Sequence, residues 1–157
     1  LGSSRAEAQE FYDQYFITFP KIARYFDEVK ARAQKDGFTT TYFGRKRSFA
    51  GIKSPIPYIR AGAERQAGNA PLQGTAADII KVAMKKAHDD LGKAGLLTKA
   101  RLLLQIHDEL LYEVNEEDAG TACGIIKNAM ENAVSFPVPL TVSIKRGTRW
   151  GDLKTKN

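Results

Sequence analysis

The spacing of apolar residues over the first 37 positions predicts two helices. Ser4 stands three residues before Glu7, which is the spacing of a capping box and places the start of the first helix there. Pro20 ends that helix and is suited to begin the second, which Gly37 would close as a C-cap. Aromatic residues at every fourth position predict one buried face on the first helix. They are Phe11, Tyr15 and Phe19.

The pattern then changes period several times. Residues 38–43 are β-branched and aromatic, and a basic turn with a return strand follows, so a hairpin is predicted. A long helix is predicted from about Tyr58 to Lys93. Two short apolar strands come next, followed by a helix with acids in its first turn and a final alternating strand at 138–147. Strands joined by hairpins pair antiparallel, so the predicted fold class is α+β.

The turn between the two apolar strands carries three consecutive ionisable residues, His107, Asp108 and Glu109. The strands Leu102–Ile106 and Leu110–Val114 leave so few residues between them that the three lie at a tight turn. Two carboxylates at a hairpin tip are suited to hold a hard divalent cation such as Mg²⁺. A polar turn that merely ends two buried strands is the competing interpretation.

A second candidate site lies on the long helix. Arg65, Asn69 and Gln73 are spaced i, i+4 and i+8 and therefore share one face. Amide and guanidinium donors suit the acceptors of a duplex minor groove, whereas an ordinary polar surface is the alternative. Pro71 is predicted to kink this helix. Two flanking glycines would admit a close neighbour, and they are Gly68 and Gly74.

The amino-acid composition excludes few classes of protein. The 157 residues are 43% hydrophobic and 27% charged, as in an ordinary globular domain. The formal charge of +6 is compatible with a polyanionic partner, and the basic turn Arg45, Lys46 and Arg47 is suited to phosphate contact or simply to solvent. The single cysteine, Cys123, excludes an internal disulfide and is expected to be packed. No apolar run has a membrane-spanning length, so a cytoplasmic location is expected.

Taken together, these segments resemble the C-terminal part of the DNA polymerase I family, the family A DNA polymerases. The stretch "LLLQIHDELLYEV" resembles the family's motif C, and "ERQAGNAPLQGTAADIIKVAM" is similar to its long palm helix. The stretches "TYFGRKR" and "VPLTVSIKRGTRWGDL" resemble a template-side hairpin and the closing palm strand. The resemblance covers nearly the whole chain in the right order.

The resemblance implies a role for each candidate residue. Asp108 would be a metal ligand supported by Glu109, and His107 would reach the primer-terminal base pair. The helix residues Arg65, Asn69 and Gln73 would line the minor groove, and Arg45, Lys46 and Arg47 would contact the template strand. In the complete enzyme two Mg²⁺ ions would bridge Asp108 and an aspartate of motif A during template-directed addition of deoxynucleotides to a primer.

The same resemblance predicts that the chain is a fragment, because no motif A strand or fingers helix is recognisable. Residues 1–37 would follow the fingers, and residues 38–157 would form a palm subdomain of the right-hand fold. The implied partners are primer-template DNA and deoxynucleoside triphosphates, with no membrane, in a monomeric longer protein that acts in replication or repair. Two alternatives remain open: a non-catalytic DNA-binding fragment, and a metal-dependent nuclease built on Asp108 and Glu109.

Overall fold

The computed structural model describes residues 4–155, and its contacts divide the chain into two compact units. The first comprises residues 1–75 and the second residues 76–157, with the division inside a long helix. The predicted assignment of residues 38–157 to a palm subdomain stays a prediction.

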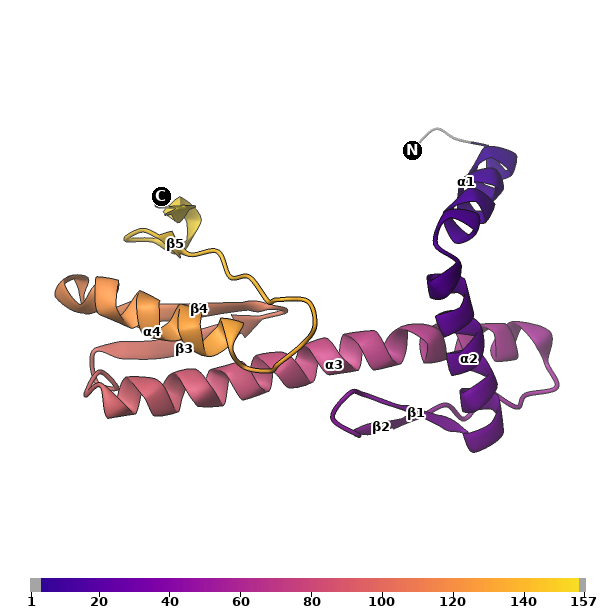
Figure 1. Ribbon diagram of the computed structural model, residues 1–157, viewed down its shortest axis with the longest axis horizontal. Coiled ribbons are helices and arrows are strands. Elements are labelled where there is room, and N and C mark those ends of the chain that lie inside the picture. The colour runs from indigo at the N-terminus through magenta and orange to yellow at the C-terminus, as the bar shows by residue number, and fades with distance from the viewer. Residues whose placement is uncertain (1–3, 156–157) are drawn as a thin grey trace. The chain divides into compact units, whose positions relative to one another are not determined.

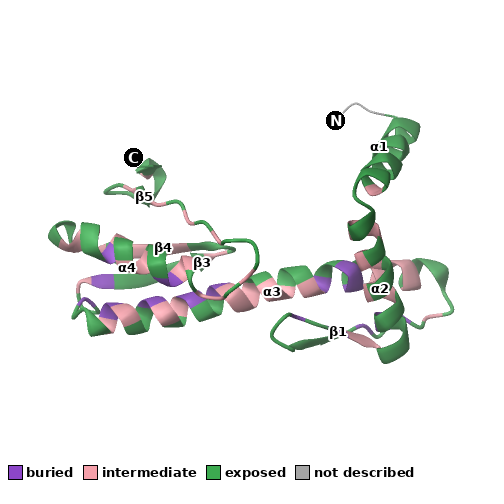
Figure 2. Cartoon of the chain, viewed as in Figure 1, coloured by how far each residue is buried: buried purple, intermediate pink, exposed green. Residues whose placement is uncertain are grey.

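The first helix, α1 (Arg5–Thr18), begins where its capping box predicts. The backbone N–H of Glu7 donates to the Ser4 hydroxyl, and the Glu7 carboxylate accepts from the Ser4 N–H. Those hydrogen bonds hold the pKa of Glu7 below its ordinary value. The predicted buried face is wrong: Phe11 is 75% exposed, and α1 buries no residue. Figure 2 shows this helix exposed almost throughout, because no described element covers it.

The second helix, α2 (Pro20–Asp36), has the predicted start and end. Gly37 closes it at φ 82°, a left-handed conformation that glycine adopts without a Cβ penalty. The aromatic ring of Phe16 packs edge-on against Phe26 of α2, with ring centroids 6.4 Å apart. This contact ties α1 to α2 although most of the α1 surface faces solvent.

The core of the first unit forms where α2 and a small hairpin meet the long helix α3 (Pro57–Lys93). The hairpin strands are β1 (Phe38–Thr40) and β2 (Lys46–Ser48), paired antiparallel as predicted. Small side chains allow the helices to approach closely, and the larger Phe49 and Ile52 fill the gap. The buried residues of this core are Ala33, Phe49, Ile52, Ala67 and Ala70.

The second unit packs a longer hairpin between helices. Its strands are β3 (Ala100–Ile106) and β4 (Glu109–Val114), followed by the 3₁₀ turn η1 (Glu116–Asp118) and the helix α4 (Ala119–Glu131). Figure 1 shows α4 and the second part of α3 running alongside this hairpin. The buried cluster joins all three elements, and its residues are Leu91, Leu96, Ala100 and Ala122.

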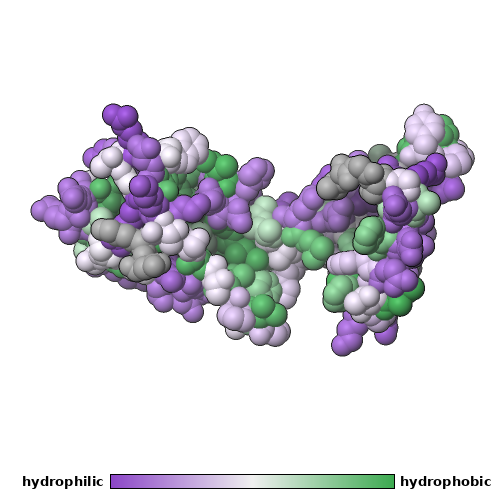
Figure 3. All heavy atoms as spheres, turned by 90° about the horizontal axis from the view of Figure 1, so that it is seen from above, coloured by the Kyte–Doolittle hydropathy of each residue, from purple (hydrophilic) through white to green (hydrophobic). Residues whose placement is uncertain are grey.

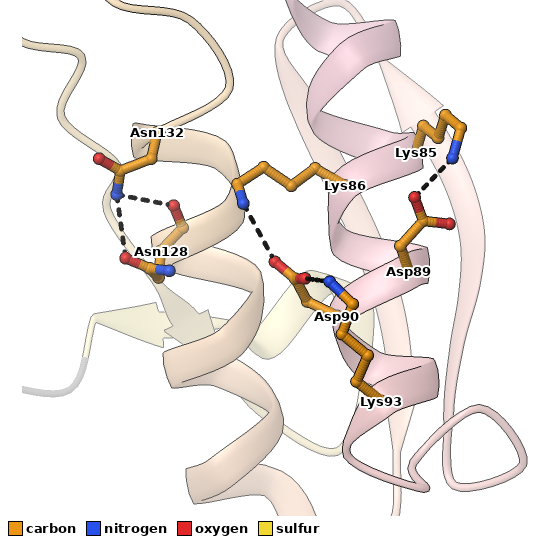
Figure 4. Close-up of polar contacts among 7 residues, drawn as sticks. All are labelled: Lys85, Lys86, Asp89, Asp90, Lys93, Asn128 and Asn132. Atoms are coloured by element: carbon orange, nitrogen blue, oxygen red, sulfur yellow. Dashed lines mark hydrogen bonds and ion pairs between the residues drawn. The ribbon is translucent and has the colours of Figure 1, made fainter.

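Charged side chains follow the solvent side of the last turns of α3. Asp90 accepts hydrogen bonds from Lys93 at 2.8 Å and from Lys86 at 3.3 Å, and Figure 4 shows it between the two ammonium groups. Lys85 makes a similar pair with Asp89 one position earlier. These hydrogen bonds lower the pKa of both carboxyls, so both remain ionised in more acidic solution than usual.

The C-terminal segment differs from its prediction. The predicted strand at 138–147 is reduced to β5 (Lys145–Arg146), which pairs with β6 (Lys154–Thr155) across the turn η2 (Trp150–Asp152). Residues 138–144 have no ladder partner among the described residues, so their alternating pattern alone does not make a strand. Trp150 is 56% exposed.

Every described strand pair is antiparallel, and the α+β fold class is confirmed. The strands form three two-stranded ladders, and α3 is helical through Pro71. Figure 3 shows apolar atoms at the surface among the polar ones. Within residues 4–155, no helix is both long enough and apolar enough to cross a membrane.

Candidate active site and nucleic-acid interface

The candidate catalytic residues lie in a two-residue turn between β3 and β4. Ile106 pairs with Glu109, which leaves His107 and Asp108 as the turn, close to the predicted geometry. His107 has φ 53°, a left-handed conformation uncommon for residues other than glycine. The Gln105 amide donates to the His107 carbonyl oxygen at 3.0 Å, which satisfies one backbone acceptor of the turn.

All three turn-side groups, His107, Asp108 and Glu109, are exposed to solvent. The strand that leads to them is also more exposed than its sequence predicts. Leu103 is 52% and Leu104 46% exposed, and the register shifts between Leu102 and Leu104. The expectation of a buried strand is therefore wrong for β3, because in the described part of the chain only β4 pairs with it.

The other strand anchors the tip. Tyr112 and Val114 of β4 pack against the buried cluster of the second unit. Burial raises the pKa of the Tyr112 hydroxyl. Lys99, just before β3, forms an ion pair of 3.0 Å with Asp118 of η1, and this hydrogen-bonded pair raises the pKa of Lys99. The tip is thus exposed, while the base of the hairpin is held at both strands.

The tip borders a hollow of about 520 Å³ in the second unit. Asp108 and Glu109 contribute to its wall, together with β4, one face of α4 and the segment 141–153. Cys123, expected to be packed, is half-buried and also lines this hollow. The hollow brings carboxylates, apolar side chains and the cations Lys145 and Arg146 of β5 to a common space.

The donor chemistry at the tip fits a hard cation, because carboxylate oxygens are the ligands that Mg²⁺ prefers. Asp108 and Glu109 are adjacent in sequence and both face solvent. Among the described residues, however, no three or more histidine, cysteine, aspartate or glutamate side chains gather as a metal site. The two carboxylates offer part of a coordination shell.

The polar stripe predicted on the long helix is solvent-exposed as a whole. Arg65, Asn69 and Gln73 are all exposed, whereas Ala67 and Ala70, on the opposite face, are buried in the core of the first unit. The burial of the alanine face leaves the amides and the guanidinium directed at solvent, where a ligand can reach them.

The two glycines near Pro71 do admit close neighbours, and both neighbours belong to this chain. A Cβ at Gly68 would lie 2.8 Å from the Phe26 ring of α2. A Cβ at Gly74 would lie 2.6 Å from the Thr41 methyl group of the β1–β2 hairpin. Gly68 therefore lets α2 pack closely on α3, and Gly74 lets the β1–β2 hairpin do so.

A role that the sequence did not reveal belongs to Thr75. Its hydroxyl accepts a hydrogen bond of 2.9 Å from the Tyr42 N–H, so it joins the hairpin turn to α3. The Arg45 guanidinium donates to the Gly74 carbonyl oxygen at 3.0 Å. The run Gly74–Thr75 within an otherwise helical stretch was the available signal, since both residues are poorer helix formers than alanine.

The three basic residues of this hairpin are exposed and differ in their contacts. Arg45 is engaged with α3, whereas Lys46 lies 4.6 Å from the centre of the Phe38 ring. The Arg47 guanidinium carbon lies 5.5 Å from the centre of the Phe49 ring. We predicted that these groups contact a template strand, and this stays a prediction. Arg45 also fixes the hairpin on the helix.

Comparison with known proteins agrees with the resemblance stated above. The family model of DNA polymerase family A matches residues 1–152. DNA polymerase I of Caldicellulosiruptor bescii is 44% identical over 151 residues, which are 96% of this chain and 18% of that protein. DNA polymerase I of Geobacillus stearothermophilus is 42% identical over 154 residues, 98% of this chain and 17% of that protein.

A solved structure agrees in fold. The polymerase domain of Pol1 from M. smegmatis, in complex with DNA primer-template and dNTP, superposes with a TM-score of 0.90 at 42% identity. The match covers 98% of this chain and 27% of that one. The chain thus spans less than a fifth of the length of the two polymerases above. Since the family model matches almost every residue, the chain belongs to DNA polymerase family A.

Proposed function

We propose that the chain is the part of a DNA-directed DNA polymerase that presents a metal-binding carboxylate to the primer terminus and holds the duplex. The observation that carries the proposal is the exposed tip of an anchored hairpin, with His107, Asp108 and Glu109 together, in a chain of this family. The M. smegmatis relative, solved with primer-template and dNTP, supports the same partners here.

In this proposal Asp108 is a metal ligand and Glu109 supports it. Mg²⁺, when bound, supplies Lewis-acid stabilisation of charge on the phosphate oxygens. The carboxylates lie on a tip whose base packs against the core, which limits how far the tip must move to meet a substrate. The remaining ligand, an aspartate of motif A, would come from a segment of the longer protein outside this sequence.

The helix residues hold the duplex in this proposal. Arg65, Asn69 and Gln73 donate to minor-groove acceptors, which every base pair presents, so the contact is independent of sequence. His107 adds a donor at the primer-terminal pair. The basic residues of the β1–β2 hairpin contact template phosphates, and they are Arg45, Lys46 and Arg47. Their contribution to DNA affinity falls as the salt concentration rises.

The experiment is primer extension by a chimera. Residues 1–152 replace the matched segment of the Geobacillus stearothermophilus polymerase, and Asp108→Asn is compared with the parent chimera. We expect the variant to lose extension by about a hundredfold or more, because a metal ligand is worth several kcal/mol in the transition state. DNA affinity should change much less.

Glu113→Gln is the matched control, since Glu113 is an exposed carboxylate on the same hairpin, at the end away from the turn. It should leave extension unchanged. A chimera that folds, binds DNA and extends equally well with Asp108 replaced would contradict the proposed role of this residue.

The isolated 157-residue chain gives a second test of the proposal. Because its described residues gather no three metal-ligating side chains, we expect it to bind primer-template DNA without extending it. Extension by the isolated chain that disappears with Asp108→Asn would show that a further ligand lies within this sequence.

A further inference from the structure

The C-terminal hairpin, residues 145–155, carries an unusual concentration of positive charge. It contains four cations, Lys145, Arg146, Arg149 and Lys154, against the single acid Asp152. Strand pairing brings Arg146 opposite Lys154. Like charges placed opposite one another destabilise a ladder, so an anion that lies between them would be favoured at this hairpin.

The charged groups are accessible and the hairpin is tightly closed. Lys145, Arg149 and Lys154 are exposed. A Cβ at Gly147 would lie 2.9 Å from the Asp152 carbonyl oxygen, so only glycine lets the two arms of the hairpin approach this closely. The cations therefore sit on a short, closed loop of backbone.

An exposed tryptophan accompanies these cations. Trp150 is 56% exposed in the turn η2, and it is the chain's only tryptophan. An indole at the surface among cations is costly to leave in water and is suited to stack on a nucleic-acid base. Interleaved cations and an aromatic ring are typical of surfaces that bind nucleic acids rather than acidic proteins.

The hairpin also borders the candidate active site. Lys145, Arg146 and Trp150 line the same hollow as Asp108 and Glu109, all within the second unit. A DNA strand with its end at these carboxylates would bring its nearest phosphates past the hairpin.

From these observations we infer that the C-terminal hairpin binds the phosphodiester backbone of the DNA whose end lies at Asp108, with Trp150 against a base. The inference rests on the proposed function for the identity of the polyanion. It adds a contact surface, and it assigns no part in the chemical step to the hairpin.

The first test uses the fluorescence of Trp150 in the 157-residue chain as a direct report on the hairpin. Titration with primer-template DNA should quench this emission and protect the indole from acrylamide. Poly-glutamate at the same charge concentration should do neither. DNA binding, detected by anisotropy of a labelled primer, with unchanged tryptophan emission and quenching would overturn the inference.

The second test removes charge from the hairpin. Lys145→Gln, Arg146→Gln and Arg149→Gln together should weaken DNA binding at about 100 mM salt by about tenfold or more. The slope of log affinity against log salt should fall by about one for each lost phosphate contact. The control, Lys81→Gln, Lys85→Gln and Lys93→Gln together, neutralises three exposed cations of the same unit on α3. Equal losses in the two variants would overturn the inference, because net charge alone would then explain them.

The two proposals fail in different ways. In the chimera, Asp108→Asn should lose extension at every DNA concentration, whereas the hairpin variant should shift half-maximal extension to a higher DNA concentration. If Asp108→Asn lost extension but the hairpin variant kept the parental DNA affinity and salt slope, only the hairpin inference would be overturned. Extension that survives Asp108→Asn would sink the proposed function.

Discussion

At the scale of single residues, the most informative position is a glycine, where the absence of a side chain lets another segment approach closely. Gly74 lies against Thr41, and the next residue, Thr75, accepts a hydrogen bond from the hairpin turn. The pair docks the β1–β2 hairpin on α3, and this hairpin carries the basic residues proposed to meet the template. A side chain added at Gly74 should therefore destabilise the first unit as a whole.

We expect Gly74→Ala to lower the free energy of unfolding by about 1–3 kcal/mol, because the added methyl group overlaps Thr41. Urea unfolding followed by circular dichroism measures this. Gly62→Ala is the control on the same helix, since its Cβ would have no neighbour closer than 3.9 Å. It should stabilise the chain by about 0.5–1 kcal/mol. A Gly74 variant as stable as the Gly62 variant would contradict the docking contact.

The ion pairs of Asp90 predict that the stability of the fold depends on pH. Its hydrogen bonds from Lys93 and Lys86 lower its pKa below the ordinary value of 3.8. A carboxyl whose pKa is lowered by folding stabilises the fold above 3.8, and that contribution is lost as pH falls through the lowered pKa. Asp90→Asn should therefore reduce the urea midpoint at about pH 6 and have a smaller effect near pH 2, where more of this carboxyl is protonated.

The control for this experiment is Asp27→Asn, at an exposed position of α2. It separates the local pairs from a general effect of net charge. If Asp90→Asn lowered the midpoint equally at both pH values, the lysine pairs would not be the cause.

At the scale of elements, α3 has two opposed faces in the first unit. Its alanines are buried against α2 and the hairpin, which leaves the polar stripe exposed. Helical period alone predicted that Arg65, Asn69 and Gln73 share a face. Which face is buried depended on Ala33 of α2 and on Phe49 and Ile52 of the connection between β2 and α3.

The stripe predicts duplex binding without sequence preference. Asn69→Ala and Gln73→Ala in the chimera should each weaken primer-template binding several-fold, equally on A·T-rich and G·C-rich duplexes, because both present minor-groove acceptors. Anisotropy titrations with the two duplexes measure this. Gln14→Ala, an exposed amide on α1, is the control. A loss confined to one duplex would contradict sequence-independent contact.

At the scale of the whole molecule, the chain exposes much apolar surface for its size. Leu103 and Leu104 of β3, Phe11 and Ile17 of α1, and Val138 are all more than two-fifths exposed. Within residues 4–155, β3 pairs only with β4, so one strand edge is open to another chain. Exposed apolar strands with an open edge favour self-association of the isolated chain.

We therefore expect the isolated chain to associate at micromolar concentrations, as measured by light scattering. Leu103→Lys should reduce this association, because a lysine on an edge strand opposes pairing with a second chain. Ile17→Lys adds the same charge on α1 and is the control. Equal reduction by both substitutions would mean that the β3 edge is not the contact.

The sequence by itself determined the features that depend on neighbouring residues. The capping box, the start at Pro20, the end at Gly37, the extent of the long helix and the tight turn at His107 and Asp108 all arise from local hydrogen bonds and allowed backbone angles. The family was recognisable for the same reason, because its motifs are short and ordered along the chain.

Only the tertiary structure decided what is buried. The aromatic residues of α1, the leucines of β3 and Trp150 have apolar patterns, yet they are exposed because burial requires a partner element, which a local pattern does not specify. Residues 138–144 alternate like a strand but pair with no other strand of the described residues. The docking role of Thr75 and the meeting of Asp108 with the C-terminal hairpin at one hollow likewise depend on segments distant in sequence.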